Sequence, residues 1–162
     1  VISPAIGPEH WNSRSNYPAL GLLQTSDREL SLYLNQCYGQ PTAHLQRYSY
    51  ERDRIACFEA GHRPGELITK PLLLPPGQLQ LNLATAAAGE ALVELQAADG
   101  TPLPGFSLAE CQPMIGNDLS MPVMWEKHSN LAARSGKPVR IRVRLQEARL
   151  FALQVKALTP VV

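Results

Sequence analysis

Two stretches of regular alternation between apolar and polar residues constrain this fold more than any other feature of the sequence. They are EALVELQ at residues 90–96 and PVRIRVRLQEARLFALQV at residues 138–155, the second interrupted by a polar break at Gln146-Glu147. Alternation with a period of two is typical of a β-strand that buries one face and exposes the other. We therefore expect both stretches to be strands and to be partners in one sheet.

Turn-forming residues divide the rest of the chain into further short strands. Asp99-Gly100 predicts a tight hairpin, because glycine accepts a positive φ freely. Small residues predict a loop at 85–89, and Pro71 indicates an edge strand or a bulge within residues 66–74, because proline cannot donate to a strand ladder. The remaining strands are expected at residues 29–35, 45–51, 54–60, 78–83 and 121–126.

Short strands at this spacing predict an all-β fold, a two-sheet antiparallel β-sandwich of the jelly-roll-like kind. The chain has 162 residues, which suits one domain or one domain with an extension. We expect residues 45–162 to form the sandwich. Residues 1–44, whose first half is rich in turn formers, are expected to form an irregular, extended N-terminal segment that packs on it.

Composition excludes several classes of function. The net charge of +1 argues against a nucleic-acid binder, and no apolar run approaches the ~20 residues that span a bilayer. The three cysteines match no zinc pattern and are expected to be small core residues. The chain begins with Val rather than Met, which suggests a mature product or an excised piece, and we expect an extracellular or periplasmic location.

No catalytic motif stands out, so we expect a protein without enzymatic activity of its own. The four histidines are scattered, no phosphate-binding glycine loop or nucleophile elbow occurs, and no carboxylates are paired by their spacing. A glycoside hydrolase would need two carboxyl groups facing one cleft at a separation of about 5–9.5 Å. Such a site is the least favoured of the alternatives.

Three guanidinium groups share one predicted strand face, at Arg140, Arg142 and Arg144. One interpretation is a groove for an anionic ligand such as a sulfated or uronic glycan, because an arginine fork matches carboxylate and sulfate oxygens. The simpler interpretation, which we favour, is a solvated face whose charges pair across the sheet with Glu90, Glu94 or Glu147.

Aromatic side chains offer a second set of candidates for carbohydrate binding, because an aromatic face fits the C–H face of a sugar ring. Tyr48 and Tyr50 share a strand face with Gln46 and are the better exposed candidates. Trp125 is also a candidate, although its parity with Val123 favours a core position.

No cofactor is predicted, and a structural calcium ion is the one metal that the sequence suggests. Asn117, Asp118 and Asp99 could supply oxygen ligands. Ordinary turn chemistry explains the same residues without a metal.

Most of the chain resembles a known bacterial module. GELITKPLLL, QLQLNLATAAAGEALVEL, ADGTPLPGFSLAEC, GND, VMW, SGKPVRIRVRL and ARLFALQV follow in that order a pattern of planctomycete-type proteins. In those proteins the pattern forms a C-terminal β-sandwich behind a five-bladed β-propeller that is related to invertase-like glycoside hydrolases. The segment at residues 12–38 resembles the junction with the propeller, and residues 45–60 resemble the first sandwich strands.

Two departures from that pattern are present. Arg52-Asp53-Arg54-Ile55 stands where the pattern has Arg-x-Asp-Gly-Phe, and Leu150-Phe151 stands where it has Leu-Tyr. The resemblance implies a non-catalytic accessory module of a glycoside hydrolase, with a polysaccharide or oligosaccharide and a catalytic propeller of the same parent chain as partners. The module is expected to bind carbohydrate, or alternatively to brace the propeller without a ligand of its own; neither nucleic acid nor a membrane is an expected partner.

Overall fold

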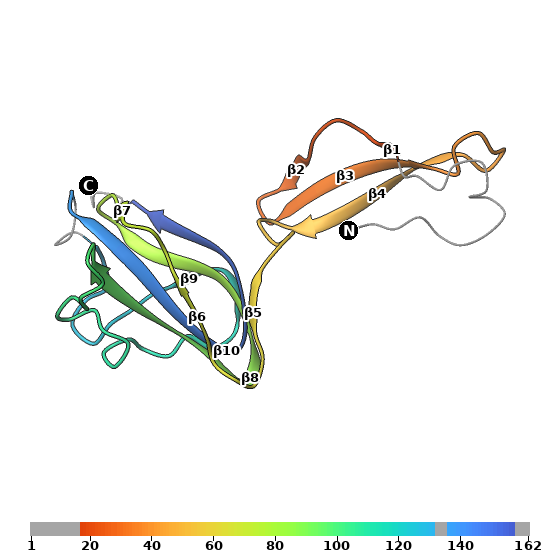
Figure 1. The fold of residues 1–162 in the computed structure, drawn as a ribbon. Coiled ribbons are helices and arrows are strands. Elements are labelled where there is room, and N and C mark those ends of the chain that lie inside the picture. The colour runs from red at the N-terminus through yellow and green to blue at the C-terminus, as the bar shows by residue number, and fades with distance from the viewer. Residues whose placement is uncertain (1–16, 132–135, 158–162) are drawn as a thin grey trace. The chain divides into compact units, whose positions relative to one another are not determined.

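The computed structural model describes residues 17–131 and 136–157, and these residues form ten β-strands and no helix. The strands make two antiparallel sheets, so the predicted all-β class is confirmed. The chain divides into two compact units, Val1–Ile55 and Ala56–Val162 (Figure 1). Residues 1–16 of the predicted N-terminal extension lie outside the described residues.

The first unit is a four-stranded sheet built around one central strand. Its strands are β1 (Tyr17–Pro18), β2 (Leu23–Ser26), β3 (Glu29–Gln36) and β4 (His44–Glu51). β4 pairs with the whole length of β3, while β1 and β2 pair with successive parts of its other edge. The predicted strand at residues 45–51 therefore pairs within the first unit.

The second unit is a six-stranded sheet dominated by two very long strands. Its members are β5 (Phe58–Ala60), β6 (Gly65–Ile68), β7 (Leu72–Leu73), β8 (Gln78–Ala97), β9 (Asn117–Pro122) and β10 (Pro138–Lys156). β8 and β10 pair along almost their whole lengths, as the two alternating stretches predicted. β9 adds to β8, while β5, β6 and β7 each pair with β10, and the interruption between β6 and β7 contains Pro71.

One hydrophobic core fills the second unit because β8 and β10 bend together and fold the sheet over itself (Figure 1). Leu79, Leu81 and Leu83 from the first half of β8 belong to the same buried cluster as Val93 and Leu95 from its second half. β10 completes the cluster with Ile141, Val143 and Leu145 before its register shift and with Ala148 and Leu150 after it.

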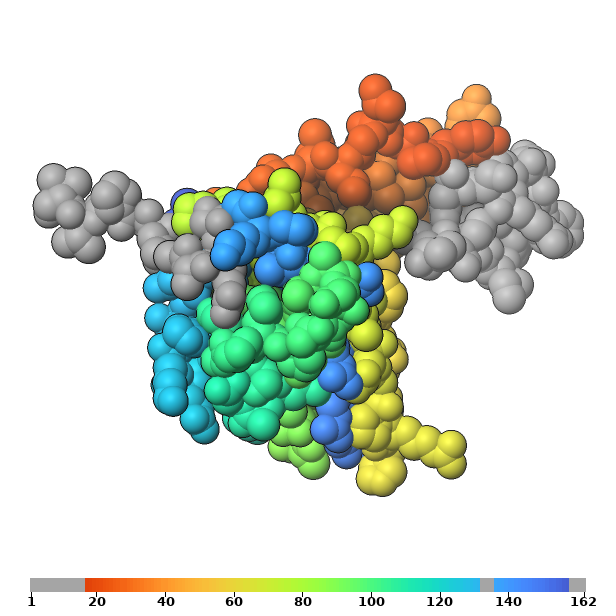
Figure 2. All heavy atoms as spheres, turned by 60° about the vertical axis from the view of Figure 1, so that its left-hand side comes forward, coloured from red at the N-terminus to blue at the C-terminus, as the bar shows by residue number. Residues whose placement is uncertain are grey.

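The segment between β8 and β9 covers the second half of β8. After the turn at Gly100, whose φ is +95°, Leu103 N and Leu95 N form backbone hydrogen bonds that join the two segments. Phe106 from this segment is buried in the core. In Figure 2 the residues from about 100 to 130, coloured green to cyan, gather on one face of the second unit.

Three details of the predicted strand map and one prediction about the cysteines are wrong. Residues 85–89 continue β8 instead of forming a loop, because β10 pairs on both sides of them and the mismatch is absorbed as a bulge. Residues 54–60 contribute only the short strand β5, which pairs with β10. The strand expected at 121–126 is β9, which begins at Asn117 and ends at Pro122. Cys57 is exposed, whereas Cys37 and Cys111 are buried as expected.

Candidate functional site

Arg142, the central member of the arginine row, forms ion pairs across the sheet, as the simpler interpretation predicted. Arg142 lies between β6 and β8 in the sheet register, opposite Glu94. Its guanidinium donates to Glu94 at 3.1 Å and to Glu66 at 2.7 Å. Both carboxylates raise the pKa of Arg142, and its charge is engaged within the fold.

Glu94 is a buried charged residue at 4% exposure, which requires partners for both of its oxygens. One oxygen accepts hydrogen bonds from Gln96 Nε2 at 2.8 Å and from Arg142; the other accepts from the backbone N–H of Leu108 at 3.2 Å. Burial opposes ionisation of Glu94, but these hydrogen bonds outweigh it and lower its pKa. The network ties β8, β10 and the covering segment together.

The flanking arginines of the row differ from Arg142. Arg140 and Arg144 are half-buried on the same strand face. The Nε of Arg140 is buried and has no hydrogen-bond partner among the described residues. Arg142 is thus the member of the row whose positive charge is balanced by two carboxylates, and it lies between Arg140 and Arg144.

Trp125 lies in the core of the second unit, so its place among the carbohydrate-binding candidates is corrected. The side chain is 3% exposed, its Nε1–H donates to the carbonyl oxygen of Val93 at 2.9 Å, and its ring meets Phe106 edge to face at 5.0 Å. No face of this ring is open to a sugar. The parity with Val123, which is fully buried, predicted the core position correctly.

Tyr48 and Tyr50 are half-exposed on β4 of the first unit. The phenol oxygen of Tyr48 accepts a hydrogen bond from Gln36 Nε2 at 2.6 Å. Tyr50 lines an open hollow of about 360 Å³ together with polar side chains of β2, β3 and β4 and the turn between β2 and β3: Ser26, Arg28, Glu29, Ser49 and Glu51. The pKa of Glu29 is lowered, chiefly by the hydrogen bond from Thr25 and also by Arg47.

The six predicted binding residues are divided between the two units. Tyr48 and Tyr50 belong to the first unit, and Trp125 and the three arginines belong to the second. Within the second unit Trp125 is in the core, whereas the arginines are half-exposed.

One face of the first unit exposes large apolar side chains. Tyr17 and Leu45 flank Asn35 in the register of the sheet, and Leu23 lies opposite Ser31 on the same face, by strand alternation. We call Tyr17, Leu23 and Leu45 the apolar face; their exposures are 48%, 55% and 65%. Further exposed apolar residues of this unit are Leu20, Leu22, Tyr38 and Ile55, and Tyr38 packs on Tyr17 with ring centroids 5.1 Å apart.

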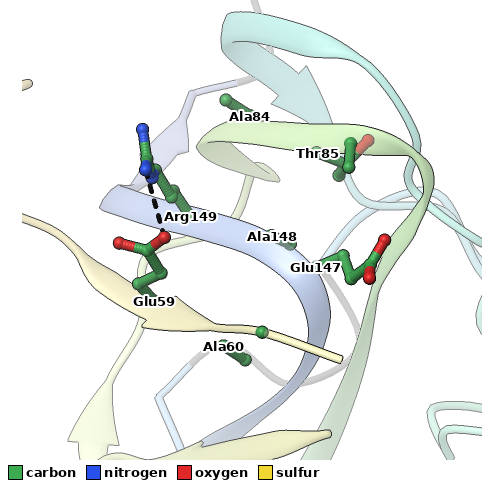
Figure 3. Close-up of a pocket in the computed structure, with 9 residues that line it drawn as sticks. Glu59, Ala60, Ala84, Thr85, Glu147, Ala148 and Arg149 are labelled. Atoms are coloured by element: carbon green, nitrogen blue, oxygen red, sulfur yellow. Dashed lines mark hydrogen bonds and ion pairs between the residues drawn. The ribbon is translucent and has the colours of Figure 1, made fainter. Parts of the chain in front are cut away.

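The second unit has a polar hollow of about 340 Å³ where β8 and β10 bend, which we call the bulge hollow (Figure 3). Its lining combines four polar side chains with small residues: Glu59, Thr85, Glu147, Arg149, Ala60, Gly61, Ala84, Ala86 and Ala148. Arg149 donates to Glu59 at 3.1 Å, and this carboxylate raises the pKa of Arg149. Glu147 lies 3.6 Å from Nδ1 of the exposed His62.

Sequence reasoning missed the bulge hollow. Its residues come from β5, β8 and β10, which lie far apart in the chain and have no common motif. The signal that could have pointed to it is the polar break at Gln146-Glu147, because a break in a strict alternation marks a bulge, and bulges re-aim side chains.

The suggested calcium ligands serve turns. Asp99 Oδ1 accepts from the N–H of Thr101 at 2.9 Å, and Asp118 Oδ1 accepts from the N–H of Ser120 at 2.9 Å. Across residues 17–131 and 136–157, no three His, Cys, Asp or Glu side chains gather as a metal site.

Comparison with known proteins gives no relative. No protein-family model matches the chain, and neither a curated protein nor a solved structure is significantly similar to it. In the described part of the chain, no helix is long and apolar enough to cross a membrane. The resemblance to a propeller-associated module therefore stays a prediction.

Proposed function

We propose that this chain is a non-catalytic β module that braces another protein domain through the apolar face of its first unit. The observation that carries the proposal is the contrast between the two units. The second unit buries a continuous core, whereas the described residues of the first unit that are buried are only Ser31, Leu34 and Cys37.

A single sheet needs an apolar layer against which it can pack. Small antiparallel sheets are stable only when an apolar face is covered, and exposed apolar patches commonly mark contacts with other proteins. Tyr17, Leu23 and Leu45 lie on one face of the first unit, and polar or charged side chains such as Ser31, Asn35 and Arg47 occupy the rest of that face. The apolar side chains lie on the outer strands and the polar ones along the central strand β3, and such a mixture of apolar and polar groups is common in protein interfaces.

The resemblance supplies the class of partner. In the planctomycete-type proteins the corresponding segment adjoins a catalytic five-bladed propeller of the same parent chain. We propose that such a domain covers the apolar face here, and that the second unit folds independently of it.

The test replaces the apolar face while the fold of the chain is monitored. In the full chain, Leu23→Ser combined with Leu45→Ser is expected to lower the binding of an apolar fluorescent dye. It should change the free energy of opening of β3, measured by hydrogen exchange, by less than about 1 kcal/mol, because both side chains are already exposed.

The matched control is Leu34→Ser on the opposite face of the same sheet, where the side chain is 3% exposed. We expect this buried substitution to cost about 2–5 kcal/mol. If the Leu23 and Leu45 substitutions destabilise β3 as strongly as the Leu34 substitution, the apolar face is used within the chain and the proposal fails.

Carbohydrate binding is the second candidate function, and the hollow beside Tyr50 favours it. Its lining brings Tyr50 of β4 together with two carboxylates and an arginine, namely Glu29, Glu51 and Arg28, although strand alternation places the Tyr50 ring on the other face of β4 from both carboxylates. Charged groups of this kind bind the hydroxyls of a sugar, and the half-exposed rings of Tyr48 and Tyr50, which share the opposite face of β4, are candidates to stack on its C–H face.

A glycan array that covers neutral, sulfated and uronic polysaccharides tests this second function. Binding that is lost in Tyr50→Ala and kept in Tyr38→Ala, a change at an exposed tyrosine outside the hollow, supports it. Loss in Arg144→Gln, with Tyr50→Ala unaffected, assigns the ligand to the arginine row instead. If no glycan binds, carbohydrate binding is contradicted and the brace remains the proposed function.

A further inference from the structure

The second unit contains a rigid, strained site that neither the brace nor the Tyr50 hollow uses. β10 shifts its register between Gln146 and Ala148, opposite an excess of residues in β8. Glu147, the residue in the shift, has a φ of +44°, a region that non-glycine residues rarely occupy. Its carboxylate lines the bulge hollow.

Contacts on two sides hold this strained backbone in place. The N–H of Glu147 donates to the carbonyl oxygen of Gly61 at 2.9 Å. On the other side β8 approaches so closely that a Cβ on Gly89 would lie 2.3 Å from the carbonyl oxygen of Glu147. Glycine at position 89 permits this approach, so the backbone conformation of Glu147 is held by contacts on both sides.

Small side chains leave room between two polar rims of the bulge hollow. In Figure 3, Glu59 and Arg149 form one rim, Thr85 and Glu147 lie at the other, and Ala148 is between them. The remaining lining is alanine and glycine. A volume of about 340 Å³ falls within the range of roughly 300–1,000 Å³ that small-molecule sites occupy.

We propose that the bulge hollow binds the ring of an uncharged sugar. Carboxylates accept hydrogen bonds from hydroxyl groups and the guanidinium donates to them, while the Thr85 hydroxyl can do both. Of the lining alanines, Ala84 and Ala86 are at least partly exposed and would meet the C–H surface of the ring, whereas Ala60 and Ala148 belong to the buried core. Two carboxylates and one guanidinium give the lining a formal charge of −1, which disfavours uronic and sulfated sugars.

None of the residues that line the hollow is aromatic, so binding depends on hydrogen bonds and is expected to be weak, in the millimolar range. This inference is independent of the brace, because it concerns side chains of the second unit alone. It is also distinct from the Tyr50 hollow, whose lining belongs to the first unit.

The test is a titration of the isotope-labelled full chain with glucose, galactose, mannose and glucuronate, followed by amide NMR. At least one neutral sugar is expected to shift the amide signals of Gly61, Thr85 and Glu147 in a saturable manner, and glucuronate is expected to shift them far less. The variant Glu147→Gly removes the carboxylate and suits the positive φ, so it should keep the fold while it weakens binding at least tenfold.

The control Glu126→Gln removes a carboxylate charge from an exposed position of the same unit outside the hollow, and should bind like the unmodified chain. The proposal is overturned if no neutral sugar shifts these amides, if glucuronate binds better than the neutral sugars, or if Glu147→Gly binds as well as the control. Shifts confined to Tyr50 and its neighbours would assign sugar binding to the first unit instead.

Discussion

Single residues decide which charges of this protein are structural. Glu94 and Arg142 are neighbours across β8 and β10, and the carboxylate is buried while the guanidinium bridges it to Glu66 at the sheet surface. An isolated buried carboxylate would be costly, and its three donors explain why the ionised form persists. Arg142 therefore has a structural role in the second unit that does not depend on any ligand.

Glu94 predicts an acid-sensitive second unit. Its pKa is lower in the folded chain than the value of 4.5 expected when it is unfolded. The stability that it contributes is fully present above that value and is lost as the pH falls through the folded pKa.

The variant Glu94→Gln should lower the free energy of unfolding at pH 7 by about 1–3 kcal/mol, because Arg142 and Leu108 lose a charged acceptor. The difference from the unmodified chain should shrink as the pH falls below 4.5. Urea unfolding at several pH values measures it, and Glu126→Gln serves as the exposed control. A difference that stays constant with pH would show that the Glu94 charge is not responsible.

Trp125 gives a second residue-scale prediction. Trp125→Phe keeps an aromatic ring against Phe106 but leaves the carbonyl oxygen of Val93 without its donor. We expect a loss of about 1–3 kcal/mol in the free energy of unfolding, with glycan-array results unchanged. A change in glycan binding at unchanged stability would return Trp125 to the binding candidates.

At the scale of the elements, alternation predicted the long strands but not how they bend. The apolar positions of β8 and β10 could be read from the sequence because a strand with a period of two buries alternate residues. The burial of Glu94 and Gln96 on the other face could not, because it depends on a covering segment far from them in the chain. The same holds for the bulge hollow, which exists only where β5, β8 and β10 meet.

The bend itself depends on Gly89. Gly89→Ala should destabilise the second unit by about 2 kcal/mol or more, because the new methyl group would collide with the Glu147 and Gln146 carbonyl oxygens at 2.3 and 2.8 Å. Gly61→Ala is the matched control, since no atom lies within 4 Å of the position of its added Cβ. Thermal unfolding followed by circular dichroism compares them, and equal melting temperatures would contradict this account of the bend.

At the scale of the whole molecule, the chain consists of two β units that differ in how much apolar surface they bury. Ala56–Val162 contains a continuous buried core, whereas the sheet of Val1–Ile55 exposes the apolar face. The division could not be read from the sequence, because residues 45–51 have the alternation of any half-buried strand and nothing local assigns them to a sheet. The boundary predicted after residue 44 lies before this strand, whereas the units divide after Ile55.

The brace depends on the second unit folding on its own and on the first unit being stabilised by an external partner. The most direct test compares the unfolding of residues 56–162 alone with the unfolding of the same unit in the full chain, by hydrogen exchange at the amides of β8 and β10. Equal protection in both, together with weak protection of β3 in the full chain, is the result that the account predicts. If the second unit loses protection when residues 1–55 are removed, the apolar face is covered within this chain and the brace is contradicted.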